Sequence, residues 1–168
     1  MPELPDYMFA HGREADPVFS SEESLYRRVP PTCWDDGEID IDAIVFPDMS
    51  VTRSKYGPAS SARWVGEDCV PWAVIEFQVK DVPLEIRYQG AFLYRMRPVH
   101  RPNRRNYPHS EVQVFESLWD GPSREEHITK ENIEKVPKDA QQVWRERLLR
   151  KCRVALRPDE GSLEDGLE

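Results

Sequence analysis

The stretch WAVIEFQV, residues 72–79, decides the fold class of this chain. Its side chains alternate with the period of two that is typical of a strand with one buried face, and it is rich in β-branched and aromatic residues. One side of this strand carries Ala73, Ile75, Phe77 and Val79, and the other carries Trp72, Val74, Glu76 and Gln78. We therefore predict a strand here, bounded by Pro83.

Similar patterns predict further strands on both sides of this stretch. They are IDIDAIVF (39–46), LEIRY (84–88), AFLYRMR (91–97) and EVQVFESLW (111–119), with a turn at 89–90. Two segments are less regular. SSEESLYRRVPP (20–31) has a capping-box spacing that predicts a short helix, with a strand over 25–29 as the alternative, and MSVTRSKYGPASSARW (49–64) is expected to be a loop or a single helical turn.

The C-terminal third predicts helix over 128–135 and again over 137–156, where Pro137 suits a first turn. Apolar side chains recur there at spacings of three and four; they are Ala140, Val143, Trp144, Leu148, Cys152 and Ala155. The predicted fold class is α+β, with a mainly antiparallel sheet of about five strands and a C-terminal amphipathic helix. Residues 1–156 would form a single domain that begins with an irregular arm (1–19), and 157–168 would be a disordered acidic tail.

The composition limits the function. A chain of 168 residues is long enough for one domain with a hydrophobic core. No stretch has the roughly 18 to 20 apolar residues of a membrane span, and the start lacks the pattern of a secretory signal, so we expect a soluble, cytoplasmic protein. Three scattered cysteines predict free thiols in a reducing compartment; they are Cys33, Cys69 and Cys152.

The net charge of -8 argues against general binding of nucleic acid. The stretch RMRPVHRPNRR (95–105) nevertheless contains five arginines and no acidic residue. Guanidinium groups bind phosphate or carboxylate in pairs of hydrogen bonds, so this stripe is a candidate site for an anion or an acidic protein partner. The alternative is an edge strand and loop kept soluble by charges that pair with other parts of the chain.

Two polar clusters are candidate ligand sites. In TRSKYG (52–57), Arg53, Lys55 and Tyr56 would suit a phosphate and a stacked base, although an ordinary exposed loop has the same composition. The second cluster is RRNYPHSEVQVFE (104–116). If its chain is extended, the side chains of Tyr107, His109 and Glu111 share one face.

The pair His109 and Glu111 suits general acid–base catalysis, because a carboxylate orients an imidazole and tunes its proton affinity. The alternative is that Pro108 fixes a bend and both side chains pair locally. The leading hypothesis is that the two clusters converge on an anionic ligand, a nucleotide or phosphorylated small molecule, as in a transferase or hydrolase. No metal-ligand spacing is present, and the sequence names no cofactor.

A non-catalytic interaction module is the competing hypothesis, in which the arginine stripe meets an acidic partner and Trp64 or Trp119 anchors the contact. A protein whose acidic face mimics nucleic acid is a third option, which the arginine stripe disfavours.

Three short patches resemble the Arg, Ser and Glu stations of ADP-ribosyltransferase-like domains. They are LYRRV (25–29), SVTRS (50–54) and HSEVQVFE (109–116). The resemblance implies a domain that uses NAD. It gives Arg27 or Arg28 a contact to the dinucleotide, a place on a middle strand to Ser50 or Ser54, and the role of catalytic carboxylate to Glu111. The Ser-Thr-Ser run and the Glu-x-Glu of that family are absent from this chain.

Overall fold

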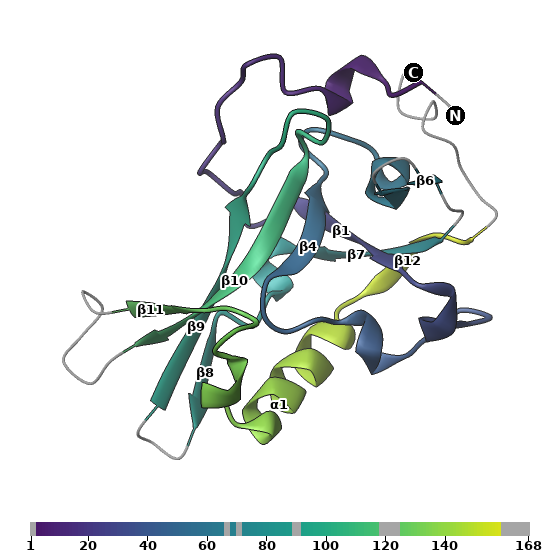
Figure 1. Ribbon diagram of the computed structural model, residues 1–168. Helices are drawn as coiled ribbons and strands as arrows, with labels where there is room; N and C mark the ends of the chain where they lie inside the picture. Colours follow the sequence, from purple (N-terminus) through teal and green to yellow (C-terminus); the bar gives the residue numbers. More distant parts are fainter. Residues whose placement is uncertain (1–2, 66–67, 70–71, 89–91, 118–124, 159–168) are drawn as a thin grey trace.

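The computed structural model describes residues 3–65, 68–69, 72–88, 92–117 and 125–158 (Figure 1). Strand β7 (Ala73–Gln78) confirms the strand predicted from WAVIEFQV. On its inward side Ala73, Ile75 and Phe77 are at most 2% exposed and belong to the hydrophobic core. The alternation of the sequence is therefore the alternation between the two faces of this strand.

The described strands of the main sheet number eight, against about five expected, and they are paired antiparallel. Seven follow the order β12-β7-β1-β4-β10-β9-β8, and β11 pairs with β10 beside β4. The sheet curls, so that β9 and β10 run across the direction of β1 and β7 (Figure 1). The predicted α+β class is confirmed. The strands besides β7 are β1 (Ser24–Val29), β4 (Met49–Arg53), β8 (Glu85–Tyr88), β9 (Phe92–His100), β10 (His109–Ser117), β11 (Glu125–Ile128) and β12 (Arg153–Leu156).

The short helix predicted over 20–31 is wrong, and the alternative strand is present as β1. Leu25 and Val29 are fully buried in the core, and their burial stabilises an extended chain with one inward face. Glu23, whose spacing from Ser20 gave the capping-box prediction, lies just before this strand and pairs with Arg53. A 3-10 turn, η2 (Pro31–Cys33), follows β1.

The strand predicted over 39–46 is also wrong for most of its length. A two-residue strand, β3 (Glu38–Ile39), pairs with β2 (Trp34–Asp35), and the chain then forms the 3-10 turn η3 (Ile41–Ala43). The side chain of Asp40 accepts a hydrogen bond from the backbone N–H of Asp42, which caps this turn. Asp40 thus caps the turn, and Asp42 pairs with Arg145, so the alternating aspartates do not form a polar strand face.

Residues 49–64, predicted as a loop or helical turn, begin with a central strand. Strand β4 pairs with β1 on one side and β10 on the other. The helical turn is η4 (Ala59–Arg63), which packs over β1 and β7. A second short hairpin follows, with strands β5 (Trp64–Val65) and β6 (Asp68–Cys69).

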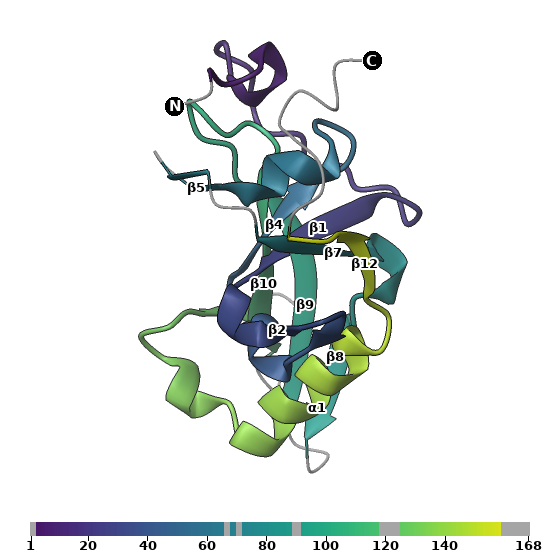
Figure 2. The same cartoon turned by 90° about the vertical axis from the view of Figure 1, so that its right-hand side faces the viewer.

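The predicted C-terminal amphipathic helix is confirmed as α1 (Lys138–Leu149), with Ala140, Trp144 and Leu148 buried. It ends before the predicted residue 156, because the chain turns at Cys152 and adds β12 beside β7. Helix over 128–135 is reduced to the turn η7 (Ile133–Lys135) after β11. The helix and the β2–β3 hairpin cover the core side of the curled sheet (Figure 2).

The arm predicted over 1–19 contains one 3-10 turn, η1 (Asp6–Met8), and crosses the end of the sheet beside the β9–β10 connection (Figure 1). A further turn, η5 (Val79–Asp81), follows β7. None of the helices in the described part of the chain has the length and apolar composition needed to cross a membrane. The cytoplasmic location stays a prediction. The predictions for Trp119, for a turn at 89–90 and for residues 159–168 concern positions outside the described residues.

Candidate functional site

Three neighbouring strands, β1, β4 and β10, share a face that points away from the hydrophobic core. Alternate residues of each strand belong to the core, which assigns the intervening ones to the opposite face. The strand register aligns Tyr26 with Thr52 and Thr52 with His109, and it aligns Ser50 with Glu111. We call this surface the polar face, and its residues are Tyr26, Arg28, Ser50, Thr52, His109 and Glu111.

The two candidate catalytic residues do share this face, as predicted. His109 Nδ1 lies 2.8 Å from the carbonyl oxygen of Arg101, and its Nε2 lies 3.3 Å from Ser50 Oγ. A carbonyl only accepts, so in the neutral ring Nδ1 carries the proton and Nε2 is left as an acceptor. Glu111 accepts a hydrogen bond of 3.1 Å from Gln113 Nε2. The imidazole and the carboxylate therefore flank Ser50 without bonding to each other.

Of the two arginines on β1, Arg27 points to the core side. Its Nε donates to the carbonyl oxygen of Ala43 and its Nη1 to that of Ser50, at 3.1 Å each. Burial, first, and the neighbouring Arg28 lower the pKa of Arg27 to about 10. Arg27 therefore connects β1 to the backbone of η3 and β4, away from the side chain of Ser50.

Arg28 follows Tyr26 by two residues in β1, and Ser50 precedes Thr52, the partner of Tyr26, by two residues in β4. Arg28 and Ser50 therefore both lie on the polar face. Its guanidinium stands 4.8 Å from the centroid of the Trp72 ring. Burial lowers the pKa of Arg28, and its buried Nη1 has no hydrogen-bond partner among the described residues. A buried guanidinium nitrogen without a hydrogen-bond partner is costly, whereas the Arg28 side chain as a whole is only partly buried.

Arg53, the first predicted ligand-binding cation, is fully buried and its donors are occupied within the chain. Nε and Nη2 each donate to the Glu23 carboxylate over 2.8 Å. Nη1 donates to the carbonyl oxygen of Asp16 over 2.8 Å, and Nη2 to that of Val18 over 2.6 Å. The Phe19 ring lies 3.8 Å from the guanidinium carbon. Arg53 therefore holds the end of the arm against β1 and β4.

Lys55 and Tyr56, the other two residues of that cluster, bind the side chain of Asp16. Lys55 Nζ and Tyr56 Oη donate to Asp16 Oδ2 over 2.8 Å and 2.6 Å. These two bonds, with that from Lys55 first, hold the pKa of the Asp16 carboxyl well below its ordinary range. The pKa of Lys55 is raised in turn, chiefly by its bond to Asp16.

The last predicted ligand residue, Tyr107, is buried and donates from its hydroxyl to the carbonyl oxygen of Glu14 over 2.9 Å. The rings of Tyr107, Tyr56 and His100 contact one another, and His100 stacks on Tyr56 with centroids 5.4 Å apart. His100 Nδ1 accepts from the backbone N–H of Asp16 over 2.8 Å, and Nε2 then donates to the carbonyl of Tyr107 over 2.6 Å. The ring stack thus fastens the arm as well.

The two clusters are adjacent along the backbone, because the backbone N–H of Arg53 donates to the carbonyl of Pro108 over 2.9 Å. Their side chains do not converge as predicted, since Arg53 is buried on the core side of β4 and His109 and Glu111 lie on the polar face.

Sequence patterns missed Asp16, Glu23 and His100, which neutralise or stack on the predicted ligand residues. Asp16 lies in the segment predicted as an irregular arm, and Glu23 in the segment predicted to begin a helix with a capping box. Their distance from residues 53–56 along the chain left no local signal.

A shallow pocket of about 330 Å³, open to solvent, adjoins the polar face at the end of β1 and β4. Three aromatic rings lie in its wall, one from the arm, one from β1 and one from the loop after β4. Its lining residues are Tyr7, Tyr26, Ser54, Tyr56, Gly57 and Pro58. Burial raises the pKa of Tyr7 to about 12, so these hydroxyls stay protonated at neutral pH. The Tyr56 ring already stacks on His100 and its hydroxyl donates to Asp16. The pocket therefore suits a planar aromatic ligand chiefly through Tyr7 and Tyr26.

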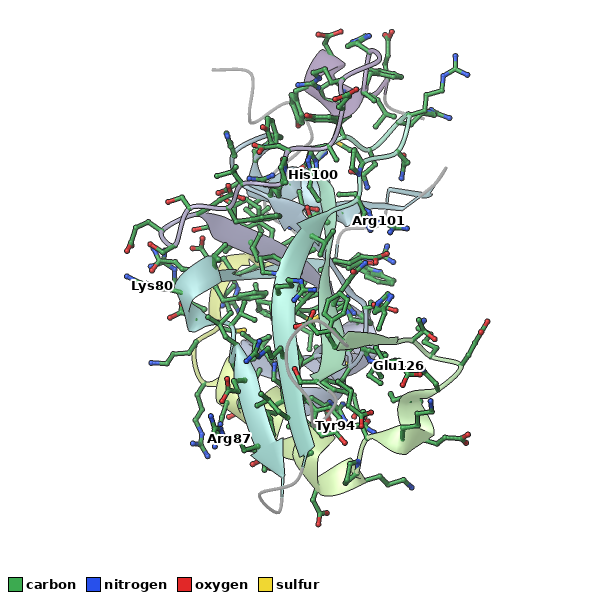
Figure 3. All side chains as sticks on the ribbon, turned by 90° about the vertical axis from the view of Figure 1, so that its left-hand side faces the viewer. Lys80, Arg87, Tyr94, His100, Arg101 and Glu126 are labelled. Atoms are coloured by element: carbon green, nitrogen blue, oxygen red, sulfur yellow. The ribbon has the colours of Figure 1, made fainter. Side chains whose placement is uncertain are left out.

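The arginine stripe divides into two parts. Arg95 and Arg97 on β9 face Glu125 of β11, with nitrogen–oxygen distances of 3.9 Å and 2.8 Å, and Arg97 also covers the Phe115 ring. Arg101, Arg104 and Arg105 are exposed and have no ion pair within the described part of the chain. The side chain of Arg101 projects outward near the upper end of the sheet (Figure 3).

No group of three or more His, Cys, Asp or Glu side chains within the described ranges is arranged to hold a metal ion. Cys33 and Cys152 are free thiols, and burial raises the pKa of Cys152 to about 12. Comparison with known proteins adds no assignment, since no protein-family model, curated protein or solved structure matches this chain. The function has to be inferred from the geometry of the polar face.

Proposed function

We propose that the polar face binds NAD and that the domain catalyses ADP-ribosyl transfer, with Glu111 as the catalytic carboxylate. One observation carries the proposal. Arg28, Ser50 and Glu111, drawn from three patches far apart in sequence, occupy one face of three adjacent strands, β1, β4 and β10 (Figure 1). These are the three patches that resemble the Arg, Ser and Glu stations of ADP-ribosyltransferase-like domains.

The phosphate contact in this proposal comes from Arg28. Its side chain is only partly buried on the polar face, so its guanidinium gives a dinucleotide pyrophosphate a charged partner, although Nη1 itself is buried. Arg53 and Lys55, the cations expected to neutralise the ligand, already face Glu23 and Asp16. We therefore assign the anion to Arg28 and a purely structural role to Arg53 and Lys55.

The chemical step breaks the bond between C1′ of the nicotinamide ribose and the nicotinamide nitrogen, and the bonding electron pair leaves with nicotinamide. The ribose then has oxocarbenium character, and the carboxylate of Glu111 stabilises the positive charge. The nucleophilic atom of the acceptor, or water, forms the new bond to C1′. Its proton passes to His109 Nε2, which is the acceptor nitrogen of the neutral ring.

Thermal unfolding in the presence of NAD tests the binding part of this proposal. A ligand at about 100 times its Kd stabilises the folded state by about 2.7 kcal/mol, which raises the Tm of a domain of this size by about 5–10 °C. We expect this shift for the wild type and for Arg95→Gln, the control on β9. Arg28→Gln should lose most of it. No shift with NAD in the wild type, or an equal shift in Arg28→Gln, would refute the proposed site.

A further inference from the structure

The connection between β9 and β10 presents three exposed arginines on a rigid turn. Asn103 and Asn106 exchange two backbone hydrogen bonds of 3.3 Å, which leaves Arg104 and Arg105 at the tip. The arm holds this turn from behind, because the N–H of Ala10 donates to the carbonyl of Arg104 over 3.0 Å. We call the set Arg101, Arg104 and Arg105 the arginine loop. The backbone of this loop is held by hydrogen bonds, and its three arginine side chains are exposed.

The arginine loop and the tyrosine pocket flank the same polar face. The backbone N–H of Arg101 donates to the carbonyl of His109 over 3.0 Å, so a row runs from Tyr26 through Thr52 and His109 to Arg101. With strands about 4.8 Å apart, this row spans about 14 Å. Thr52 in this row is buried, whereas Tyr26 and His109 are partly exposed, so an anionic ligand that contacts the arginines at one end and the pocket at the other would pass over Thr52.

From these two features we propose that this surface binds single-stranded nucleic acid. The arginines bind phosphates through paired hydrogen bonds, and an unstacked base enters the pocket of about 330 Å³ and contacts chiefly the rings of Tyr7 and Tyr26. The net charge of -8 does not prevent this, because charges farther away than a Debye length of about 8–10 Å are largely screened at physiological salt. The inference goes beyond the proposed NAD site and does not depend on it.

Fluorescence anisotropy of labelled 12-nucleotide oligo-dT and oligo-U, measured without NAD, tests this inference. Contact with three phosphates of a single strand gives a slope of about -2.1 in log K against log salt, which is a roughly 20-fold loss of affinity between 50 and 200 mM salt. The triple variant Arg101→Gln, Arg104→Gln, Arg105→Gln should bind at least about 10-fold more weakly at 50 mM salt and with a flatter slope.

The matched control carries the same change of charge at the other end of the molecule. In this control glutamine replaces three exposed residues, Arg147, Arg150 and Lys151. They lie on α1 or just after it, far from the β9–β10 connection (Figure 1). This control should bind like the wild type, whereas Tyr7→Leu should weaken binding about 10-fold with an unchanged salt slope. Circular dichroism checks that each variant is folded.

Three results would overturn the inference. One is the absence of oligonucleotide binding by the wild type at 50 mM salt. Another is an equal loss in the control and in the triple variant, since this would mean that only total charge matters. The third is preferential binding of a poly-glutamate peptide that is lost in the triple variant, which would identify an acidic protein segment as the partner.

Discussion

Replacing Arg53 by methionine should destabilise the domain severely, although the residue lies outside the proposed NAD site. Its side chain is 0% exposed, and that of its partner Glu23 is 6% exposed. The substitution leaves the Glu23 carboxylate buried without a counter-charge, and it removes the donors to the carbonyls of Asp16 and Val18. Removing one partner of a buried pair costs about 3–5 kcal/mol, which is at least about a fifth of the 5–15 kcal/mol that stabilise a typical domain.

Urea unfolding followed by tryptophan fluorescence measures this loss, provided that the slope with denaturant stays unchanged. Arg95→Met is the matched control, because Arg95 is also a strand arginine with an acidic neighbour but is 38% exposed and 3.9 Å from Glu125. That control should cost less than about 1 kcal/mol. The double variant Arg53→Met, Glu23→Leu should regain part of the stability, since no charge is then left buried. A loss below about 1 kcal/mol in Arg53→Met would refute the reasoning.

Two further predictions concern the arm and the helix. The lowered pKa of Asp16 means that its bonds to Lys55 and Tyr56 stabilise the fold above the ordinary carboxyl pKa of about 4, and that this stability is lost as the pH falls toward the lowered pKa. The urea midpoint of Asp16→Asn should therefore fall less than that of the wild type between pH 7 and pH 3, and an identical fall would contradict this linkage. Trp144→Ala should cost about 3–5 kcal/mol of stability, because Trp144 is 1% exposed, packs on Phe46 and donates a hydrogen bond to the carbonyl of Pro83. Val143→Ala, at an exposed position, should change the urea midpoint little. Similar losses in both variants would count against this packing.

Local patterns predicted those elements whose residues carry their own signal. The three-to-four spacing in α1 arises from burial on one side, and the alternation in β7 from the more complete burial of its core-facing side, although Val74 on the other side is buried too. Over 39–46, alternation misled, because an aspartate that caps a turn has the same spacing as one on a strand face. Strand β4 was missed since its outward residues Ser50 and Thr52 are polar and its inward Arg53 is charged.

The candidate site was predicted in part for a similar reason. That His109 and Glu111 share a face follows from the period of a strand, whereas their position beside Ser50 depends on how β10 pairs with β4. The burial of Arg53 depends on Glu23, which lies on a different part of the chain. A sequence pattern identifies residues able to bind an anion, but pairing between distant segments decides which of them are free to do so.

Release of nicotinamide from NAD is the measurement that tests the proposed reaction most directly. Proton NMR follows nicotinamide formation by the wild type, with water or a single-stranded oligonucleotide as acceptor. Each NAD consumed should release one free nicotinamide. Glu111→Gln should reduce the rate at least about 100-fold while it keeps the thermal shift with NAD, and Glu85→Gln on the edge strand β8 should leave the rate unchanged. Intact NAD after incubation with the wild type under both conditions, or an undiminished rate in Glu111→Gln, would contradict the assignment of this face as an ADP-ribosyltransferase site.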